Sequence, residues 1–170
     1  MNQPDHPPAV SIVGRAKSGK TTLIEKLIPQ LKRQGLRVGT VKHHAHPGFE
    51  IDYPGKDTWR HAQAGSEHVV IAAPDKMASI VLLPTPLSLS EILTGMRDVD
   101  LVLTDGYRQA QNPRIEVLRG AISHQLLCEP EELIAIASDI ELHVGPPWYS
   151  LDDAAGLAEL ILTQILGRSL

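Results

Sequence analysis

The chain has 170 residues, of which 42% are hydrophobic and 21% charged, with a formal net charge of −4 and one cysteine. This length and composition indicate a single globular domain over residues 1–170, and the acidic balance argues against a nucleic-acid-binding surface as the main function. No apolar run approaches the roughly 20 residues of a membrane-spanning helix. Residues 1–8, which we expect to be flexible, lack the features of a signal peptide. The lone Cys128 excludes an intrachain disulfide, and we interpret it as a small apolar residue. Without a disulfide, a signal peptide or a membrane span, we expect a cytoplasmic protein.

The first predicted element, an apolar strand over residues 9–13, runs directly into a glycine-rich loop and then into a helical pattern. The order strand, G-x-x-x-x-G-K-[ST], helix is that of a phosphate-binding P-loop. Glycines let several backbone N–H groups point at one anion, and the start of the helix adds partial positive charge there. Lys20 would reach the β- and γ-phosphates, and the Thr21 hydroxyl would bind Mg²⁺. The predicted nucleotide-binding loop consists of Gly14, Arg15, Ala16, Lys17, Ser18, Gly19, Lys20, Thr21 and Thr22.

Apolar runs and helical patterns alternate through the rest of the chain. The first helix is predicted over residues 20–34, ending before Gly35, and Pro29 should bend it or mark a boundary. A second strand is predicted over 36–41, and breakers make 43–55 irregular. The further predicted elements are a helix over 56–64, strands over 68–73 and 79–83, a helix over 89–96, strands over 100–105, 114–118 and 133–137, and a helix over 151–166.

Together these elements predict an α/β fold, a P-loop NTPase three-layer sandwich with a mostly parallel sheet. Short continuous apolar strands between helices are typical of a sheet that is covered on both faces. The short connection between strands 68–73 and 79–83 predicts an antiparallel hairpin or edge. Ligands of such sheets bind beyond the carboxyl ends of the strands. Gly14, His43, Asp105 and Asp139 all lie at the carboxyl ends of predicted strands, so we expect them at one site.

A P-loop needs a second acid to hold Mg²⁺, and Asp105 is the best candidate. The apolar strand before it and Gly106 after it form the Walker B pattern. Asp100 begins the same strand, which is the wrong end for a metal ligand, and reads as a solvated turn residue.

The segment from residue 42 to 61 is rich in polar groups and follows the second strand, where P-loop GTPases place a loop that senses the γ-phosphate. Asp52 could bind the metal or position the attacking water, or it could simply cap the following turn. Lys42 and His43 could contact phosphates, although a solvated lysine fits equally well. His43, His44 and His46 could bind a metal, or be solvated or contact phosphate.

Two further residues carry open alternatives. Arg15, in the loop itself, could act across a subunit interface or be a solvated cation near the phosphates. Asp139 follows the strand over 133–137 and could accept hydrogen bonds from N1 and N2 of guanine, which would select against adenine. It could also be an ordinary turn residue.

The chain resembles the MobB family, molybdopterin-guanine dinucleotide biosynthesis protein B, over roughly residues 9–166. The specific part is the sequence VKHH at 41–44 leading to FEIDYPGKDTWR at 49–60, which is similar to the family's Val-Lys-His and Asp-x-Pro-Gly-Lys-Asp-[ST] block. Residues 100–108 and 114–117 resemble the family's Walker B strand and the strand after it. One departure is Asp105, where the family usually has Glu. The shorter side chain could hold Mg²⁺ through water.

The resemblance implies a GTP-binding, weakly hydrolysing homodimer whose sheet extends across the subunit interface. It would assist the guanylyltransferase MobA, which attaches GMP to molybdopterin. The cofactors would be GTP and Mg²⁺, held by the P-loop with Asp105 and Asp52. Two alternatives from other classes are a nickel-inserting GTPase metallochaperone, suggested by the histidines, and a small-molecule kinase with residues 109–114 as a short lid.

Overall fold

The computed structural model of the chain describes residues 5–46 and 48–168. The expectation that residues 1–8 are flexible falls partly on residues 1–4, which lie outside this description. The chain divides into two compact units, one formed by residues 1–43 and 89–170 and the other by residues 44–88.

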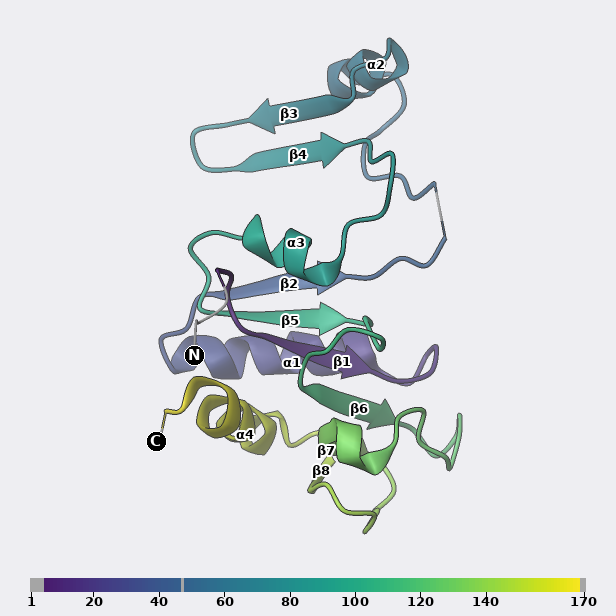
Figure 1. The fold of residues 1–170 in the computed structure, drawn as a ribbon, viewed down its shortest axis with the longest axis vertical. Coiled ribbons are helices and arrows are strands. Elements are labelled where there is room, and N and C mark those ends of the chain that lie inside the picture. Colours follow the sequence, from purple (N-terminus) through teal and green to yellow (C-terminus); the bar gives the residue numbers. More distant parts are fainter. Residues whose placement is uncertain (1–4, 47, 169–170) are drawn as a thin grey trace. The chain divides into compact units, whose positions relative to one another are not determined.

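The larger unit is built on a six-stranded sheet with the strand order β2-β5-β1-β6-β7-β8 (Figure 1). All neighbouring strands in it are parallel. The predicted mostly parallel sheet is therefore confirmed. The strands are β1 (Ala9–Val13), β2 (Val38–Lys42), β5 (Leu101–Asp105), β6 (Arg114–Leu118), β7 (Leu133–Ser138) and β8 (Trp148–Ser150).

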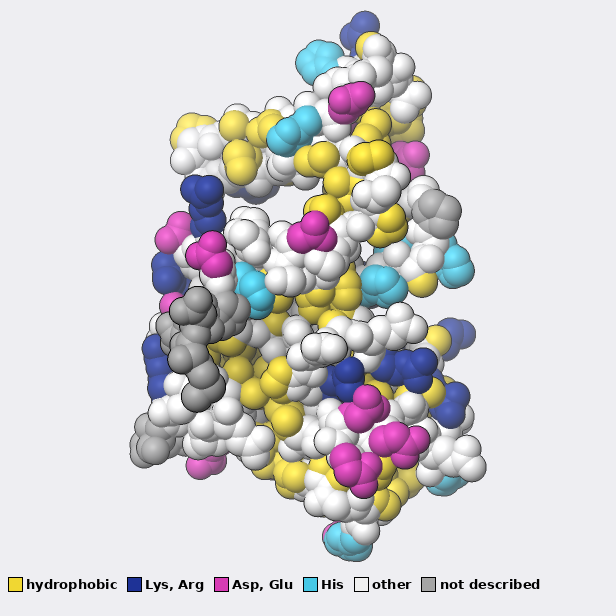
Figure 2. Space-filling view, viewed as in Figure 1, with side chains coloured by type: hydrophobic (Ala, Val, Ile, Leu, Met, Phe, Trp, Pro, Cys, Tyr) yellow, Lys and Arg dark blue, Asp and Glu magenta, His cyan; other side chains and the backbone are white. Residues whose placement is uncertain are grey.

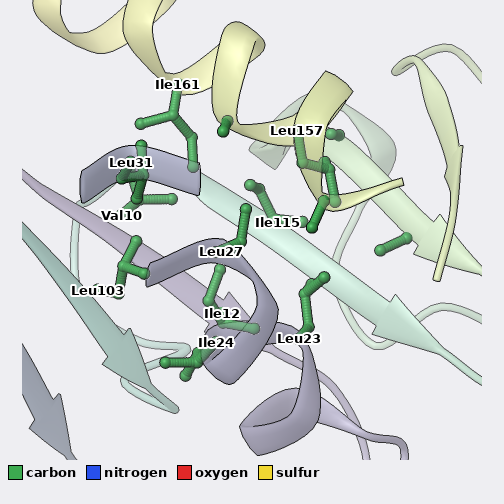
Figure 3. Close-up of a cluster of buried hydrophobic side chains, with 14 of the residues drawn as sticks. Val10, Ile12, Leu23, Ile24, Leu27, Leu31, Leu103, Ile115, Leu157 and Ile161 are labelled. Atoms are coloured by element: carbon green, nitrogen blue, oxygen red, sulfur yellow. The ribbon is translucent and has the colours of Figure 1, made fainter. Parts of the chain in front are cut away.

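One face of this sheet is covered by two helices, α1 (Lys20–Arg33) and α4 (Ala154–Leu166). Helical spacing brings Leu27 and Leu31 of α1 to the sheet, and Leu157 and Ile161 of α4 join them (Figure 3). All four side chains are fully buried. The core therefore holds the start of α1, and with it the P-loop, against the carboxyl end of β1.

The other face is covered by shorter segments. The helix α3 (Leu89–Thr94) packs Leu89 and Leu93 on Ala9 and Val102. Beside it, buried side chains around Val13 form a second cluster under the segment that includes the 3₁₀-helix η1 (Pro130–Glu132). That cluster comprises Val13, Cys128, Leu133 and Ile136, with Leu126, Leu127, Leu142 and Trp148 packed against it. The three layers match the predicted sandwich.

The ends of the helices follow from local sequence. Gly35 adopts φ 78°, and its N–H and that of Leu36 bond to carbonyls in the last turn of α1, which closes the helix as predicted. Pro29 lies inside α1, which continues past it to Arg33. At α4, Asp153 accepts a hydrogen bond from the backbone N of Gly156, so the helix starts three residues later than the predicted 151.

The smaller unit contains α2 (Asp57–Gln63) and an antiparallel hairpin of β3 (His68–Ala72) and β4 (Met77–Val81). The predicted helix and hairpin are both confirmed. The hairpin forms a two-stranded sheet of its own, separate from the six-stranded sheet. Among the described residues, no helix is both long enough and apolar enough to cross a membrane.

Candidate functional site

The loop between β1 and α1 has the backbone shape of a phosphate cradle. Gly14 and Gly19 have φ values of 146° and 105°, and Lys17 is also left-handed with φ 64°. A Cβ at position 14 would collide with the carbonyl oxygen of Val117, so only glycine fits there. The Nζ of Lys20 donates to the carbonyl oxygens of residues 14 and 15, at 3.0 and 2.9 Å. This geometry fits the predicted P-loop, with the helix start and the lysine at one point.

The Asp105 carboxylate is the meeting point of three elements. Its Oδ2 accepts hydrogen bonds from Thr21 Oγ1 at 3.0 Å and from Lys42 Nζ at 2.7 Å. In the sheet register, Asp105 is paired with Ile12 of β1 and with Lys42 of β2. The sheet thus places the Walker B acid beside the P-loop, as predicted. Hydroxyl and carboxylate oxygens are ligands that Mg²⁺ prefers, so Thr21 and Asp105 fit this cation.

Asp100, just before the start of β5, has a structural role. Asp100 accepts hydrogen bonds from the backbone N and from the guanidinium of Arg37, at 2.7 Å and 3.1 Å. These hydrogen bonds are the main reason that the pKa of Asp100 is lowered. Asp100 therefore fixes the start of the strand, and the site lies at the other end.

The turn after Asp105 has two consecutive residues in the left-handed region. Gly106 has φ 102° and Tyr107 has φ 59°. A Cβ at Gly106 would lie 3.1 Å from the Cβ of His43, and the His43 and Tyr107 rings are 4.8 Å apart. Left-handed non-glycine residues are uncommon and often mark functional turns. His43 is thus placed beside the Walker B turn, where a contact with phosphate stays a prediction.

On the other side of the P-loop, Asp139 follows β7 and Arg119 follows β6. Oδ1 of Asp139 accepts a hydrogen bond from the backbone N of Gly120 at 2.7 Å, and its Oδ2 lies 3.9 Å from Arg119 Nη1. The Nε of Arg119 donates to the carbonyl oxygen of Ser18 at 3.3 Å. An arginine that the sequence reading did not single out therefore lies between the P-loop and the predicted base-reading acid.

Other predicted residues fall outside this cluster. Arg15, Ala16, Lys17 and Thr22 are exposed, and an action of Arg15 across a subunit interface stays a prediction. Arg114, the cation of the suggested kinase lid, begins β6 and donates to Glu132 Oε1 and to the carbonyl oxygen of Ala110. These contacts at the start of the strand do not suit a lid over phosphates.

Asp52, His44 and His46 belong to the smaller unit. Asp52 Oδ1 accepts a hydrogen bond from the backbone N of the next residue, Tyr53, at 2.8 Å, and both its capping and its metal-binding alternatives stay predictions. The His44 ring lies 6.1 Å from that of His46 and 5.9 Å from that of Phe49. Within residues 5–46 and 48–168, no three His, Cys, Asp or Glu side chains are grouped to hold a metal. The structure therefore gives the nickel alternative no support.

Comparison with known proteins decides the family. The profile of the family described as molybdopterin guanine dinucleotide synthesis protein B matches residues 9–139. The chain belongs to the MobB family. It is 34% identical to the molybdopterin-guanine dinucleotide biosynthesis adapter protein of Haemophilus influenzae, over 91% of this chain and 87% of that protein. It is 31% identical to the adapter protein of the same name from Escherichia coli, over 91% of each chain.

Solved MobB structures agree with this membership. The crystal structure of Bacillus subtilis MobB matches with a TM-score of 0.75 and 27% identity, over 95% of this chain and 99% of that one. Another crystal structure, of molybdopterin-guanine biosynthesis protein B, matches with a TM-score of 0.65 and 32% identity, over 91% and 97% of the two chains. The resemblance predicted from the segment at 41–60 is thereby confirmed, as is the P-loop fold.

One more acid next to the site was missed by sequence reasoning. Glu116 in β6 is buried, and its carboxylate accepts hydrogen bonds from the backbone N of Leu127 and of Cys128, at 2.7 and 3.0 Å. These bonds hold the segment after β6 against the sheet. The sequence did offer a signal for Glu116, because an acid within an apolar strand is expected to be buried and then needs hydrogen-bond partners. Arg119 had the same signal as Asp139, namely its place directly after a strand.

Proposed function

We propose that this chain is an adapter of molybdopterin-guanine dinucleotide biosynthesis that binds Mg²⁺ and GTP and assists a guanylyltransferase such as MobA. Its MobB relatives carry the name of biosynthesis adapter proteins. The observation that carries the proposal is the contact of Thr21 and Lys42 with one carboxylate oxygen of Asp105, directly beside the P-loop. A nucleoside triphosphate requires a phosphate-binding loop, metal ligands and a cation close together, and here these are the P-loop, Thr21 with Asp105, and Lys42.

The residues of the chain have distinct roles in this proposal. The backbone N–H groups of residues 14–22 would surround the phosphates, and Lys20 would neutralise their charge. Thr21 and Asp105 would hold Mg²⁺, which supplies further charge neutralisation on the phosphate oxygens. Lys42, whose side chain is 69% exposed, is free to turn from Asp105 toward a phosphate. Asp139 would accept the N1 and N2 protons of guanine.

Hydrolysis is expected to be slow. The side chains bonded to Asp105 are a hydroxyl and an ammonium group, neither of which is a base that activates water. Asp52, the other acid suggested for this task, bonds to the backbone of its own turn. An adapter with bound, slowly hydrolysed GTP suits a role in delivering or presenting a nucleotide or a molybdopterin to a partner enzyme.

A homodimer is part of the proposal, and the smaller unit supports it. Yellow hydrophobic side chains are visible over β3 and β4 in Figure 2. Within the described residues each strand of this hairpin pairs only with the other, which leaves one edge of each unpaired. A second copy of the same hairpin would extend the sheet and cover the apolar residues. Within residues 44–88, the large apolar side chains exposed by 40% or more are Phe49, Ile51, Tyr53, Val70, Ile71, Met77, Val81, Leu82, Leu83 and Leu87.

Titration calorimetry with GTP and with ATP, each with Mg²⁺, tests the proposal. We expect GTP to bind and ATP to bind more weakly, with GTP turnover far slower than in a kinase given its acceptor. Co-purification with a molybdenum-cofactor guanylyltransferase tests the adapter role. Absence of nucleotide binding, or a clear preference for ATP, would contradict the proposal.

A further inference from the structure

In the six-stranded sheet, strands lie on both sides of β1, the strand that leads into the P-loop. The residues proposed to bind the metal lie on one of these sides. Lys42 and Asp105 end β2 and β5, which lie on one side of β1 in the strand order, and Thr21 donates to Asp105. On the opposite side, the order in which the strands follow one another changes between β1 and β6. The strand after β1 in the chain, β2, lies at one edge of the sheet, whereas β6, β7 and β8 follow one another to the other edge. Ligands of doubly wound sheets bind in the crevice at such a switch point. A nucleotide whose phosphates lie in the P-loop would extend its nucleoside to this side.

Two charged residues leave the sheet at this switch point. Leu118 and Ser138 are partners in the register of β6 and β7, and the residues directly after them are Arg119 and Asp139. A crevice too narrow for a water molecule lies next to Arg119 and is lined by Arg15, Ser18, Glu116, Arg119, Ile122 and Gln125. Arg119 is therefore placed between the phosphate-binding loop and Asp139, the residue that we propose binds the guanine base.

The contacts of Arg119 connect those two parts. Its Nε donates to the carbonyl oxygen of Ser18 at 3.3 Å, and its Nη2 lies 3.2 Å from the position that a Cβ on Gly19 would take. Its Nη1 lies 3.9 Å from Oδ2 of Asp139. The pKa of Asp152 is lowered by the hydrogen bond that it accepts from Lys26 at 2.6 Å and, in smaller part, by the charge of Arg119.

The Asp139 carboxylate is anchored and still has capacity for a ligand. Its Oδ1 accepts one hydrogen bond, from Gly120 N, and each carboxylate oxygen can accept two. Its side chain is 39% exposed. A carboxylate held in this way can accept from the N1–H and the exocyclic N2–H of guanine, whereas adenine presents an acceptor at N1.

We infer that Arg119 is a positioning residue that couples base selection to phosphate binding, by holding the Asp139 carboxylate in a fixed place relative to the P-loop. This inference rests on the proposed binding of GTP. If Arg119 only stabilised the P-loop, its loss would weaken the binding of all phosphate ligands equally. A direct cation–phosphate contact would not distinguish between bases either.

Three ligands separate these roles: GTP, ITP, which lacks the exocyclic amine, and inorganic tripolyphosphate, which lacks the nucleoside. Affinities with Mg²⁺ are measured by calorimetry for the wild type, Arg119→Ala, Arg119→Lys and Asp139→Asn. The matched control is Arg33→Ala, because this exposed arginine is at the far end of α1 and contacts Gln30. Urea unfolding of each variant shows whether it is folded.

We expect the wild type and Arg33→Ala to prefer GTP over ITP by roughly 10-fold, the size of a hydrogen bond to a charged group. Arg119→Ala should bring this ratio close to 1, as Asp139→Asn does, while tripolyphosphate affinity changes less than about 3-fold. Arg119→Lys should retain part of the ratio and serves as the test if Arg119→Ala does not fold. An equal loss for all three ligands, or a ratio unchanged from the wild type, overturns the inference. A wild type that binds GTP without preference over ITP overturns it too. A wild type that binds no nucleotide overturns the proposed function as well.

Discussion

The ammonium group of Lys42 lies 2.7 Å from Oδ2 of Asp105, and the two residues are paired in register at the carboxyl ends of β2 and β5. Because parallel strands end at one edge of the sheet, the register itself brings the lysine that ends β2 to the Walker B acid that ends β5. Asp105 is largely buried, with 11% of its side chain exposed, and Lys42 is mostly exposed. The acid is thus fixed in place, while the lysine can exchange partners.

This relationship predicts how substitution of Asp105 changes the effect of magnesium. In the wild type, GTP should bind more tightly with Mg²⁺ than with EDTA, by about 10-fold or more, as expected for a charged ligand contact. Asp105→Asn should remove most of this difference, and Asp105→Glu should keep it because a carboxylate is retained. Asp100→Asn, an acid at the other end of β5, is the control and should keep the full difference. Calorimetry with and without Mg²⁺ measures it, and an undiminished magnesium effect in Asp105→Asn would contradict the assignment.

A second prediction concerns Lys20. Its Nζ is placed over the loop by two backbone carbonyl oxygens, where it would meet the β- and γ-phosphates. Lys20→Ala should weaken GTP binding by on the order of 100-fold, because charge-assisted hydrogen bonds to phosphate are lost. Lys32→Ala, in the exposed last turn of the same helix, should bind GTP like the wild type. Equal affinities of Lys20→Ala and the wild type would mean that the loop is not the nucleotide site.

The sequence predicted the parts of the site whose chemistry is local. Gly14, Lys20 and Thr21 are specified by one motif, and Asp105 by an apolar strand that ends in an acid and a glycine. The strand β8 was missed, because it has three residues and follows two prolines. Its place beside β7 comes from pairing in the sheet, which leaves no periodic pattern in so short a segment.

Arg119 could not be assigned from the sequence because its partners are far away along the chain. It meets the carbonyl group of Ser18 and the carboxylate of Asp139, and only the order of the strands brings these together. The hairpin shows the same limit in another form. The short turn was enough to predict its antiparallel pairing. The sequence did not show that the hairpin is separate from the main sheet, because its place relative to that sheet depends on tertiary packing.

The exposed hairpin makes a prediction about oligomeric state. If a second copy pairs with this hairpin, light scattering should give twice the mass of one chain at micromolar concentration. Met77→Lys places a charge on β4, where the side chain is 69% exposed, and should shift the protein toward the monomer mass because a charged edge strand disfavours pairing. Val144→Lys, at an exposed apolar residue of the larger unit, is the control. A wild type with the monomer mass at all concentrations would refute the dimer.

The last prediction concerns the buried thiol of Cys128, 6% exposed in the cluster around Val13. Burial, with a smaller contribution from the charge of Glu116, raises the pKa of this thiol from 9.0 to about 11. The native thiol should therefore react slowly with a disulfide reagent at pH 8, and rapidly after unfolding in urea.

The same raised pKa makes stability depend on pH in a defined range. Below about pH 8 the thiol is almost fully protonated in both the folded and the unfolded state and does not make stability depend on pH. As pH rises from 9.0 to about 11, the unfolded state loses its proton first, so the free energy of unfolding falls, by on the order of 2 kcal/mol over that range. Other groups titrate there too, so the measurement is the difference between the wild type and Cys128→Ala in urea unfolding at pH 8 and at pH 10.5. The destabilisation caused by Cys128→Ala should be smaller at the higher pH. An equal difference at both pH values would show that the thiol does not keep its proton in the folded protein.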